Sequence, residues 1–324
     1  MAVLSKQHPE LPFQELVSVL DADSNEFEII RRYGDRGVLF ESDRIDFSRL
    51  AYTKEVSEIV SGPFDNFGEI DDGLDFAGSF CVRAMGFGEE IESMEELEKT
   101  AGSKLDCEKR TVNLEEPDYF FRIFSTSEGY FLGRRIFRND GGRFEKRRSH
   151  LRPFSSPVSL HPKLARCLVN LSGVKKGGTV ADPFCGTGGI ILEAGLMGMD
   201  VRGCDIDSRM VEGCTENLEF YGVESFDISE KDAFSFLEEL KGDLDAVVTD
   251  LPYGKSSLKF SDTEELVEKL LISLRDRFYG KLVFMLDRDS IAGLKADFEV
   301  YVHSSLSRYI YRVDPKQLNL EEER

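Results

Sequence analysis

The chain has 324 residues, of which 41% are hydrophobic and 31% are charged, and its formal net charge is −20. This length can bury the cores of two or three domains, and no apolar run approaches the length of a membrane-spanning helix. The N-terminus lacks the charged-then-apolar pattern of a secretory signal, so we expect a cytoplasmic protein that does not enter a membrane. The negative charge repels phosphate and argues against indiscriminate binding of nucleic acids.

The cysteines include no Cys-X-X-Cys pair, so their spacing indicates neither a zinc site nor a redox motif. We expect them to be reduced packing residues, and we expect no bound metal. They are Cys81, Cys107, Cys167, Cys185, Cys204 and Cys214.

The first 50 residues combine short apolar strands with one amphipathic helix, which predicts a small α+β unit. The strands are expected at residues 2–5, 27–30 and 38–40. The helix is expected where four apolar residues recur at helical spacing, namely Phe13, Leu16, Val17 and Leu20.

Residues 51–150 predict a second unit that ends in a basic segment. Its elements are expected to be a helix at 53–61, a strand at 80–84, an acidic helix at 93–101 and a strand at 119–123. Residues 131–152 then contain eight basic and two acidic side chains, a local charge of plus six. This segment is either a solvated basic turn or a surface that contacts phosphates, and the alternatives stay open.

A stretch rich in Ser and Pro at residues 151–157 is the expected linker to the rest of the chain. Residues 158–324 alternate strand and helix patterns and end in two strands, 298–303 and 308–313, joined by a short turn. This pattern predicts an α/β domain with a mostly parallel sheet and one antiparallel strand near its end.

A Gly-rich loop follows the first strand of this predicted domain. The strand that begins at Thr179 runs into Asp182-Pro-Phe-Cys-Gly-Thr-Gly-Gly and then into an apolar helix. Gly186 and Gly188 allow the backbone to approach a ligand closely. The loop lacks the third Gly of a dinucleotide fingerprint and the Lys-Ser/Thr of a phosphate loop, so its ligand is not expected to be a phosphate.

Acidic residues end the next two predicted strands. Asp205 can accept hydrogen bonds from a ribose diol, while Asp207 is placed to cap the following helix. Asp232, which precedes Ala233, can accept from the amino group of adenine. Together with the Gly-rich loop, these residues match a nucleoside cofactor that carries a sulfonium methyl, S-adenosylmethionine.

The sequence Asp250-Leu251-Pro252-Tyr253 follows a buried-strand pattern and predicts a site that methylates an exocyclic amine. The Asp250 carboxylate and the Leu251 carbonyl can accept both N–H groups of such an amine, and Pro252 restricts Leu251 to extended backbone angles. Tyr253 offers a flat face for an extruded base, an interaction worth about 1–3 kcal/mol. The alternative is an ordinary turn after a strand.

Several of these segments resemble the archaeal tRNA guanine-10 N2-methyltransferases. The resemblance rests on Arg152-Pro-Phe, on Ser159-Leu-His-Pro-Lys-Leu-Ala-Arg-Cys-Leu-Val-Asn-Leu, on the loop from Asp182 to Gly189 and on residues 302–313, and it extends to residues 1–22. It implies a class I Rossmann-like methyltransferase domain at 158–324. It also implies a ferredoxin-like α+β unit at 1–50 and a THUMP domain, which binds tRNA, at 51–150.

The resemblance implies roles for further residues. His161 and Phe184 are expected beside the cofactor, although a histidine at a helix start is otherwise a cap. The positive charge of residues 131–152, rather than the resemblance, gives the expectation that five arginines contact RNA: Arg134, Arg135, Arg147, Arg148 and Arg152. The family motif usually has two prolines after its Asp, whereas this chain has Leu251, and a proline there is expected to restore a fixed backbone angle.

The expected function is transfer of a methyl group from S-adenosylmethionine to the N2 amine of guanosine 10 in tRNA, by a protein for which a monomer is the favoured state. Whether the product is N2-methylguanosine or the dimethylated nucleoside stays open. Similar motifs also methylate guanine N2 at another tRNA position such as 6, adenine N6 or cytosine N4. A further alternative is a catalytically weak tRNA-binding protein that retains the fold.

Overall fold

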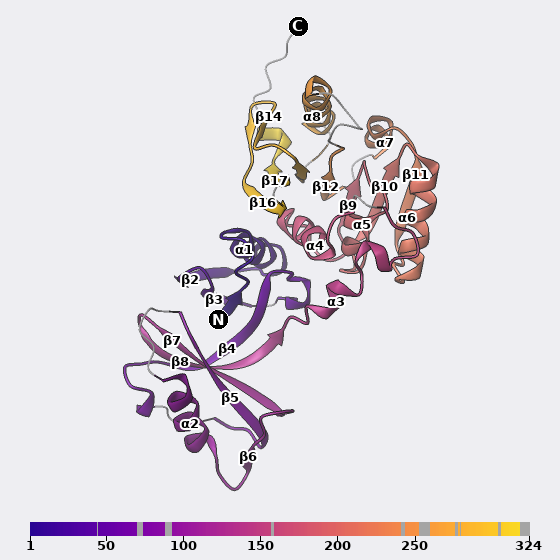
Figure 1. The fold of residues 1–324 in the computed structure, drawn as a ribbon. Coiled ribbons are helices and arrows are strands. Elements are labelled where there is room, and N and C mark those ends of the chain that lie inside the picture. The colour runs from indigo at the N-terminus through magenta and orange to yellow at the C-terminus, as the bar shows by residue number, and fades with distance from the viewer. Residues whose placement is uncertain are drawn as a thin grey trace. The chain divides into compact units, whose positions relative to one another are not determined.

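The computed structural model describes residues 1–43, 45–69, 74–87, 93–156, 159–240, 244–252, 260–275, 278, 280–303 and 306–317. The chain forms two compact units (Figure 1). The first contains Met1–Phe13, Ser24–Ser48 and Tyr52–Asn139, and the second contains Gln14–Asp23, Arg49–Ala51 and Asp140–Arg324. None of the helices in the described part of the chain is long and apolar enough to cross a membrane.

The first unit is built on an eight-stranded sheet in the order β2-β3-β1-β4-β8-β7-β5-β6. Its strands are β1 (Ala2–Leu4), β2 (Phe27–Tyr33), β3 (Gly37–Ser42), β4 (Thr53–Phe64), β5 (Gly78–Gly86), β6 (Arg110–Val112), β7 (Tyr119–Thr126) and β8 (Gly129–Arg138). Helix α2 (Met94–Leu105) packs Leu97, Ala101 and Leu105 against the sheet, and the side chain of Ser93 caps its first turn. The strands expected at 80–84 and 119–123 and the helix expected at 93–101 are confirmed.

The helix predicted at residues 53–61 is wrong, because this segment forms strand β4. Val56, Ile59 and Val60 fit a helical period, but they are β-branched and therefore also favour a strand. Pairing of β4 with β1 on one side and β8 on the other decides between the two. The same pairing carries one sheet across the predicted boundary at residues 50 and 51, so the division into units does not follow that boundary.

The second unit contains a seven-stranded sheet in the order β11-β10-β9-β12-β13-β17-β16. Its strands are β9 (Thr179–Asp182), β10 (Asp200–Asp205), β11 (Phe226–Glu230), β12 (Ala246–Asp250), β13 (Lys281–Leu286), β16 (Phe298–His303) and β17 (Leu306–Val313). β17 runs antiparallel to both neighbours, while β9 to β13 pair in parallel. The predicted α/β domain with one antiparallel strand near its end is confirmed.

The helices of this unit are α3 (Gly142–Glu145), α4 (Pro162–Leu171), α5 (Gly189–Gly195), α6 (Ser208–Phe220), α7 (Ala233–Glu239) and α8 (Phe260–Arg275). A two-stranded ribbon, β14 (Ser290–Ile291) with β15 (Leu294–Lys295), precedes β16. Helix α1 (Leu11–Asp23) contributes residues to both units. The predicted linker at 151–157 lies within the second unit, which resumes at Asp140.

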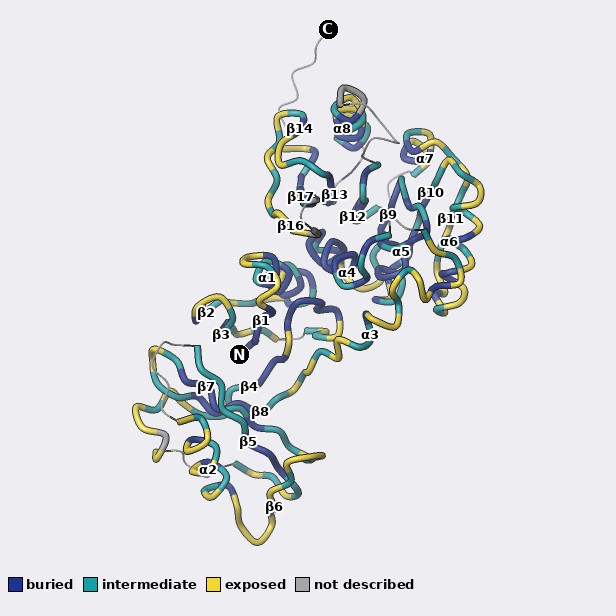
Figure 2. The backbone as a smooth tube through the Cα atoms, viewed as in Figure 1, coloured by how far each residue is buried: buried dark blue, intermediate teal, exposed yellow. Residues whose placement is uncertain are grey.

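The order of strands creates a switch point between β9 and β12. From β9 the chain builds β10 and β11 on one side, and then returns to build β12 and β13 on the other. Strands β9 and β12 are buried along nearly their whole length, as central parallel strands covered on both faces are (Figure 2). Ligands of such sheets bind outside the carboxyl ends of the strands at this point, which is where Asp182, Asp205 and Asp250 lie.

Candidate active site

The Asp182 side chain at the end of β9 forms a hydrogen bond with Thr249 near the end of β12. This side chain is buried, and its Oδ1 accepts hydrogen bonds from Thr249 Oγ1 at 2.7 Å and from the Phe184 backbone N–H at 3.0 Å. The pKa of Asp182 is raised to about 7, mainly by burial and in smaller part by the carboxylates of Asp250 and Asp205, while the two hydrogen bonds oppose the shift. Asp182 therefore fixes the start of the Gly-rich loop, and the Phe184 side chain packs against the core beneath it.

The two glycines predicted to face a ligand have left-handed backbone angles, with φ of +51° at Gly186 and +80° at Gly188. A Cβ at Gly188 would lie 2.5 Å from the Sγ of Cys214 in α6, so this position is constrained by packing. A Cβ at Gly186 would meet no atom of the described residues within 4 Å. Gly186 therefore borders open space, as a cradle for a ligand requires.

Asp205 organises the same loop from the end of β10. Its Oδ2 accepts from the Gly186 N–H at 3.0 Å and its Oδ1 from the Asp207 N–H at 2.9 Å. A carboxylate can accept further bonds through its remaining lone pairs, so these contacts leave room for a ribose diol. Asp207 accepts from the Arg209 N–H and caps α6, which confirms its predicted structural role.

Asp232 and His161 are both helix caps. Asp232 Oδ1 accepts from the Phe234 and Ser235 N–H groups at the start of α7, beside the buried Ala233. His161 Nδ1 accepts from the Lys163 N–H at the start of α4, and burial lowers the pKa of its imidazole. Of the two roles expected for His161, the structure contains the cap. The cofactor contacts of His161, Asp232 and Ala233 stay predictions.

Asp250 ends β12 in a largely buried position, with 18% of its side chain exposed. Its Oδ2 accepts a hydrogen bond from Arg308 Nη1 at 2.8 Å, and its buried Oδ1 accepts none from the residues that the structure describes. Burial raises the pKa of Asp250 to about 6, and Arg308 opposes this shift. The site thus holds one engaged and one available carboxylate oxygen.

The first residue after Asp250 extends the pairing between β12 and β13. The Leu251 N–H donates to the Met285 carbonyl of β13 at 3.2 Å, and the Leu251 side chain is buried in the core. Pro252 follows in a half-buried position, while Tyr253 lies outside the described residues. The stacking role of Tyr253 therefore stays a prediction.

Sequence reasoning missed Thr249 and Arg308, the residues that hold Asp182 and Asp250. Thr249 reads as one more β-branched residue of a buried strand. Arg308 breaks the apolar alternation of the last strand at a position that is buried in the fold. A buried-strand position occupied by arginine is the signal that could have indicated a carboxylate partner.

The five predicted RNA-binding arginines divide into two groups. Arg134 and Arg148 are exposed and paired with Glu58 and Glu145, and Arg135 stacks its guanidinium over the Phe120 ring at 3.5 Å. These three keep their predicted role.

Arg147 and Arg152 form the second group, because little of either side chain is exposed. Arg147 makes two bonds to the buried carboxylate of Glu193, at 2.7 and 3.0 Å. Arg152 is 5% exposed, and its Nε donates to the Arg147 carbonyl at 2.9 Å. Both side chains therefore stabilise the fold around α5, and their contacts with RNA stay a prediction.

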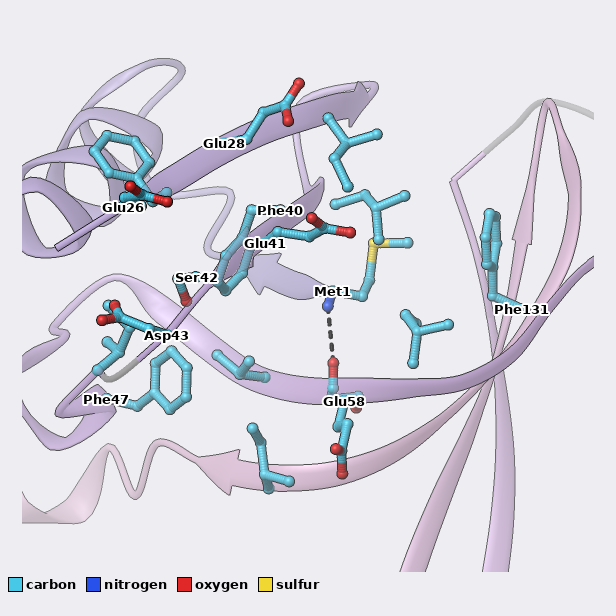
Figure 3. A pocket seen from close by; sticks show the side chains of 18 residues that line it. Met1, Glu26, Glu28, Phe40, Glu41, Ser42, Asp43, Phe47, Glu58 and Phe131 are labelled. Carbon is cyan, nitrogen blue, oxygen red and sulfur yellow. Dashed lines mark hydrogen bonds between the residues drawn. The ribbon is translucent and has the colours of Figure 1, made fainter. Parts of the chain in front are cut away.

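A cavity of about 1330 Å³ opens in the first unit beside β2, β3 and β4 (Figure 3). At its floor the Met1 amino group donates to the Ser57 carbonyl at 2.8 Å. Its walls include five acidic side chains, Glu26, Glu28, Glu41, Asp43 and Glu58. This lining repels phosphate, so the cavity is not a suitable surface for RNA.

Comparison with known proteins supports the fold described above and identifies a family model that matches the chain. Residues 149–293 match the family model described as "RMKL-like, methyltransferase domain". The structure of TrmN from Thermus thermophilus superposes with a TM-score of 0.54 at 20% identity, over 96% of this chain and 98% of that one. This likeness supports the fold alone.

Two curated archaeal proteins are similar along nearly their entire length. The tRNA (guanine(10)-N2)-dimethyltransferase of Methanothermobacter thermautotrophicus is 37% identical over 96% of this chain and 97% of its own. The protein of the same name from Methanocaldococcus jannaschii is 32% identical over 95% of this chain and 97% of its own. The resemblance noted in the sequence is thereby confirmed. The chain belongs to the tRNA (guanine(10)-N2)-dimethyltransferase family.

Proposed function

We propose that this protein transfers methyl groups from S-adenosylmethionine to the N2 amine of guanosine 10 in tRNA. The observation that carries the proposal is the buried Asp250 at the carboxyl edge of the sheet, with one oxygen held by Arg308 and the other available to an amine. The names of the archaeal relatives supply the substrate and the position. Those names also favour a dimethylated product, formed through N2-methylguanosine.

The residues around the Gly-rich loop fit the cofactor. Gly186 borders open space, and Asp205 holds the loop while keeping lone pairs for a ribose. Asp232 and Ala233, which follow β11, are the proposed adenine contacts. Phe184 within the loop and His161 at the start of α4 are proposed to lie beside the cofactor. When bound, S-adenosylmethionine supplies a methyl group that is already activated by the positive charge on its sulfur.

The chain's own residues orient the amine. The lone pair of an aromatic amine is delocalised into the ring, so acceptors at both N–H groups favour a geometry in which nitrogen is more reactive. Asp250 Oδ1 accepts one N–H and the Leu251 carbonyl accepts the other. After transfer the nitrogen carries one proton too many, and the Asp250 carboxylate is the proposed acceptor for that proton.

Recognition of tRNA is assigned to the first unit, in which residues 51–150 are proposed to act as a THUMP domain. Arg134 and Arg135 on β8 supply positive charge there, and Arg148 supplies it in the second unit. Guanosine 10 lies in a structured stem, so its base must leave the stack at a cost of a few kcal/mol. Phosphate contacts and the proposed stacking on Tyr253 offset that cost. A tRNA substrate agrees with the predicted action in the cytoplasm.

The test is transfer of labelled methyl to an unmodified tRNA transcript, followed by nucleoside identification and mapping of the modified position. The expected product is N2-methylated guanosine at position 10, and a transcript with adenosine at that position should accept no label. Asp250→Ala should nearly abolish transfer while S-adenosylmethionine affinity stays within about tenfold of wild type. Label at position 6, on adenine or on cytosine would replace the proposal with one of its alternatives.

A further inference from the structure

We propose that Arg308 is a positioning residue for this reaction, which fixes one carboxylate oxygen of Asp250 and leaves the other as the acceptor for the target amine. The inference rests on the proposed function and adds to it a residue that lies 58 positions after Asp250 in the chain. Arg308 itself is not expected to touch the substrate, because its effect is exerted through Asp250.

The geometry of the pair supports this role. Arg308 Nη1 lies 2.8 Å from Asp250 Oδ2, with 8% of the arginine side chain and 18% of the aspartate side chain exposed. A buried carboxylate oxygen without a donor is unfavourable, and Oδ1 receives none from the described residues. An amine N–H is a donor of the kind that this oxygen lacks. Arg308 thus limits the ways in which the carboxylate can rotate and determines which oxygen meets the amine.

Arg308 lies near the start of β17, and it reaches the carboxyl edge of the parallel strands because β17 runs antiparallel to them. In β17, Val313 lies opposite Leu282 at the beginning of β13, and Tyr309 lies opposite Leu286 at its end. The first residues of β17 therefore reach the edge at which the parallel strands finish. Arg308 directly precedes Tyr309 and so lies beside the end of β12. The insertion of β17 between β13 and β16 gives the site a cation that a wholly parallel sheet would lack.

Among the residues that the structure describes, the charged groups near Asp250 include Arg308 from β17 and Asp182 from β9, while β13 contributes the apolar Met285 opposite it. Burial favours the protonated form of Asp250, and Arg308 favours the carboxylate. A guanidinium next to an aspartate lowers its pKa by about 1–3 units. Without Arg308, Asp250 is protonated over much of the neutral range and loses the acceptor that the amine needs.

The experiment measures the pH dependence of single-turnover methyl transfer to the tRNA transcript, with saturating S-adenosylmethionine, for the wild type and three variants. The wild-type rate should fall as the pH drops through about 6, the pKa of Asp250. In Arg308→Gln this acid limb should move up by about 1–3 units, so that the rate at pH 7 drops roughly tenfold or more and recovers in alkaline solution. In Arg308→Lys the limb should stay within about one unit of wild type, but the plateau rate should fall, since lysine is a point charge without a planar fork.

Arg312→Gln is the matched control. Arg312 lies four residues further along β17, where it pairs with Asp297 at a partly exposed position. Its removal perturbs the same strand without touching Asp250, so both the acid limb and the plateau should be unchanged.

Folding is checked by S-adenosylmethionine calorimetry and by the double variant Asp250→Asn with Arg308→Gln, which should fold and be inactive at every pH. An Arg308→Gln enzyme that folds with an unmoved acid limb would overturn the inference. If Arg308→Gln does not fold, Arg308→Lys decides, and a wild-type plateau in that variant overturns it. A wild-type enzyme that does not methylate guanosine 10 overturns the proposed function instead.

Discussion

At Leu251 this chain departs from the two prolines usual in its family motif, and the structure gives the backbone of that residue a specific function. The Leu251 N–H bonds the Met285 carbonyl, which extends the pairing of β12 and β13 by one position. Proline would fix the φ angle but cannot donate this bond. The hydrogen bond and the buried leucine side chain together hold the carbonyl that the proposed mechanism needs.

The expectation that proline restores the site at position 251 is therefore revised. Leu251→Pro should lower the free energy of unfolding by about 1–3 kcal/mol, because it removes a backbone hydrogen bond and part of a buried side chain. Urea unfolding measures this loss. Leu251→Met is the control, since it keeps both the N–H and most of the volume, and it should lose less than about 1.5 kcal/mol. Equal stabilities of the proline variant and wild type would contradict this account of the backbone.

Among the elements, helix α5 depends on a buried network of charges. Glu193 is fully buried and accepts hydrogen bonds from Arg147, which follows α3, and from Arg166 of α4, the latter at 2.8 Å. Buried ions are stable only when paired, because the interior solvates them poorly. The network therefore connects the segment after α3 with helices α4 and α5, and it explains why part of the basic segment faces inward.

Glu193→Gln should lower the free energy of unfolding by about 3–5 kcal/mol, because it removes the carboxylate that pairs with the buried Arg166 and the largely buried Arg147. Glu145→Gln provides the comparison, since Glu145 pairs with Arg148 on the surface. That exposed pair should contribute only about 0–1 kcal/mol. Urea unfolding measures both losses. Equal losses in the two variants would show that burial does not make the Glu193 pairs contribute more to stability than the exposed pair.

At the scale of the whole molecule, an acidic protein is proposed to bind tRNA through a few exposed arginines. Neutralising Arg134 and Arg148 together should weaken tRNA binding and flatten its dependence on salt. Removing one arginine that touches a phosphate reduces the slope of log affinity against log salt by about 0.7–0.9. Arg209→Gln is the control, because Arg209 is highly exposed but pairs with the helix cap Asp207. An unchanged slope in the double variant would mean that these arginines form a solvated surface.

The division of the chain into units predicts which fragments of it can fold by themselves. Gln14–Asp23 and Arg49–Ala51 belong to the second unit, where Glu15 accepts from Asn170 at 2.8 Å and Arg49 donates to the Val174 carbonyl at 2.7 Å. Arg49 also pairs with Asp23 and is almost completely buried. A fragment that begins at residue 158 lacks these partners and the Arg147 side of the Glu193 network.

Residues 158–324 alone should therefore fold poorly and bind S-adenosylmethionine weakly, although they contain the entire sheet and the Gly-rich loop. Circular dichroism during thermal unfolding and calorimetry on the fragment and the full chain measure the difference. A fragment as stable as the full chain would show that the first 157 residues contribute nothing to the second unit.

The sequence by itself determined the alternation of strands and helices in the second unit, the Gly-rich loop and the acidic residues at strand ends. These features depend on local patterns: apolar runs set buried strands, glycines allow left-handed angles, and Asp207 caps the helix that follows it. Residues that lie at carboxyl ends of parallel strands meet at one edge, so Asp182, Asp205 and Asp250 could be grouped without a structure.

Only the tertiary structure decided which of these residues are buried and what they contact. Residues 53–61 form a strand because β1 and β8 pair with them. The Arg147 side chain points inward because it pairs with the Glu193 carboxylate of α5. Arg308 met Asp250 because β17 runs antiparallel to β13. Each outcome depends on partners distant in the chain, and burial of a charge is favourable or costly according to those partners, which local sequence cannot specify.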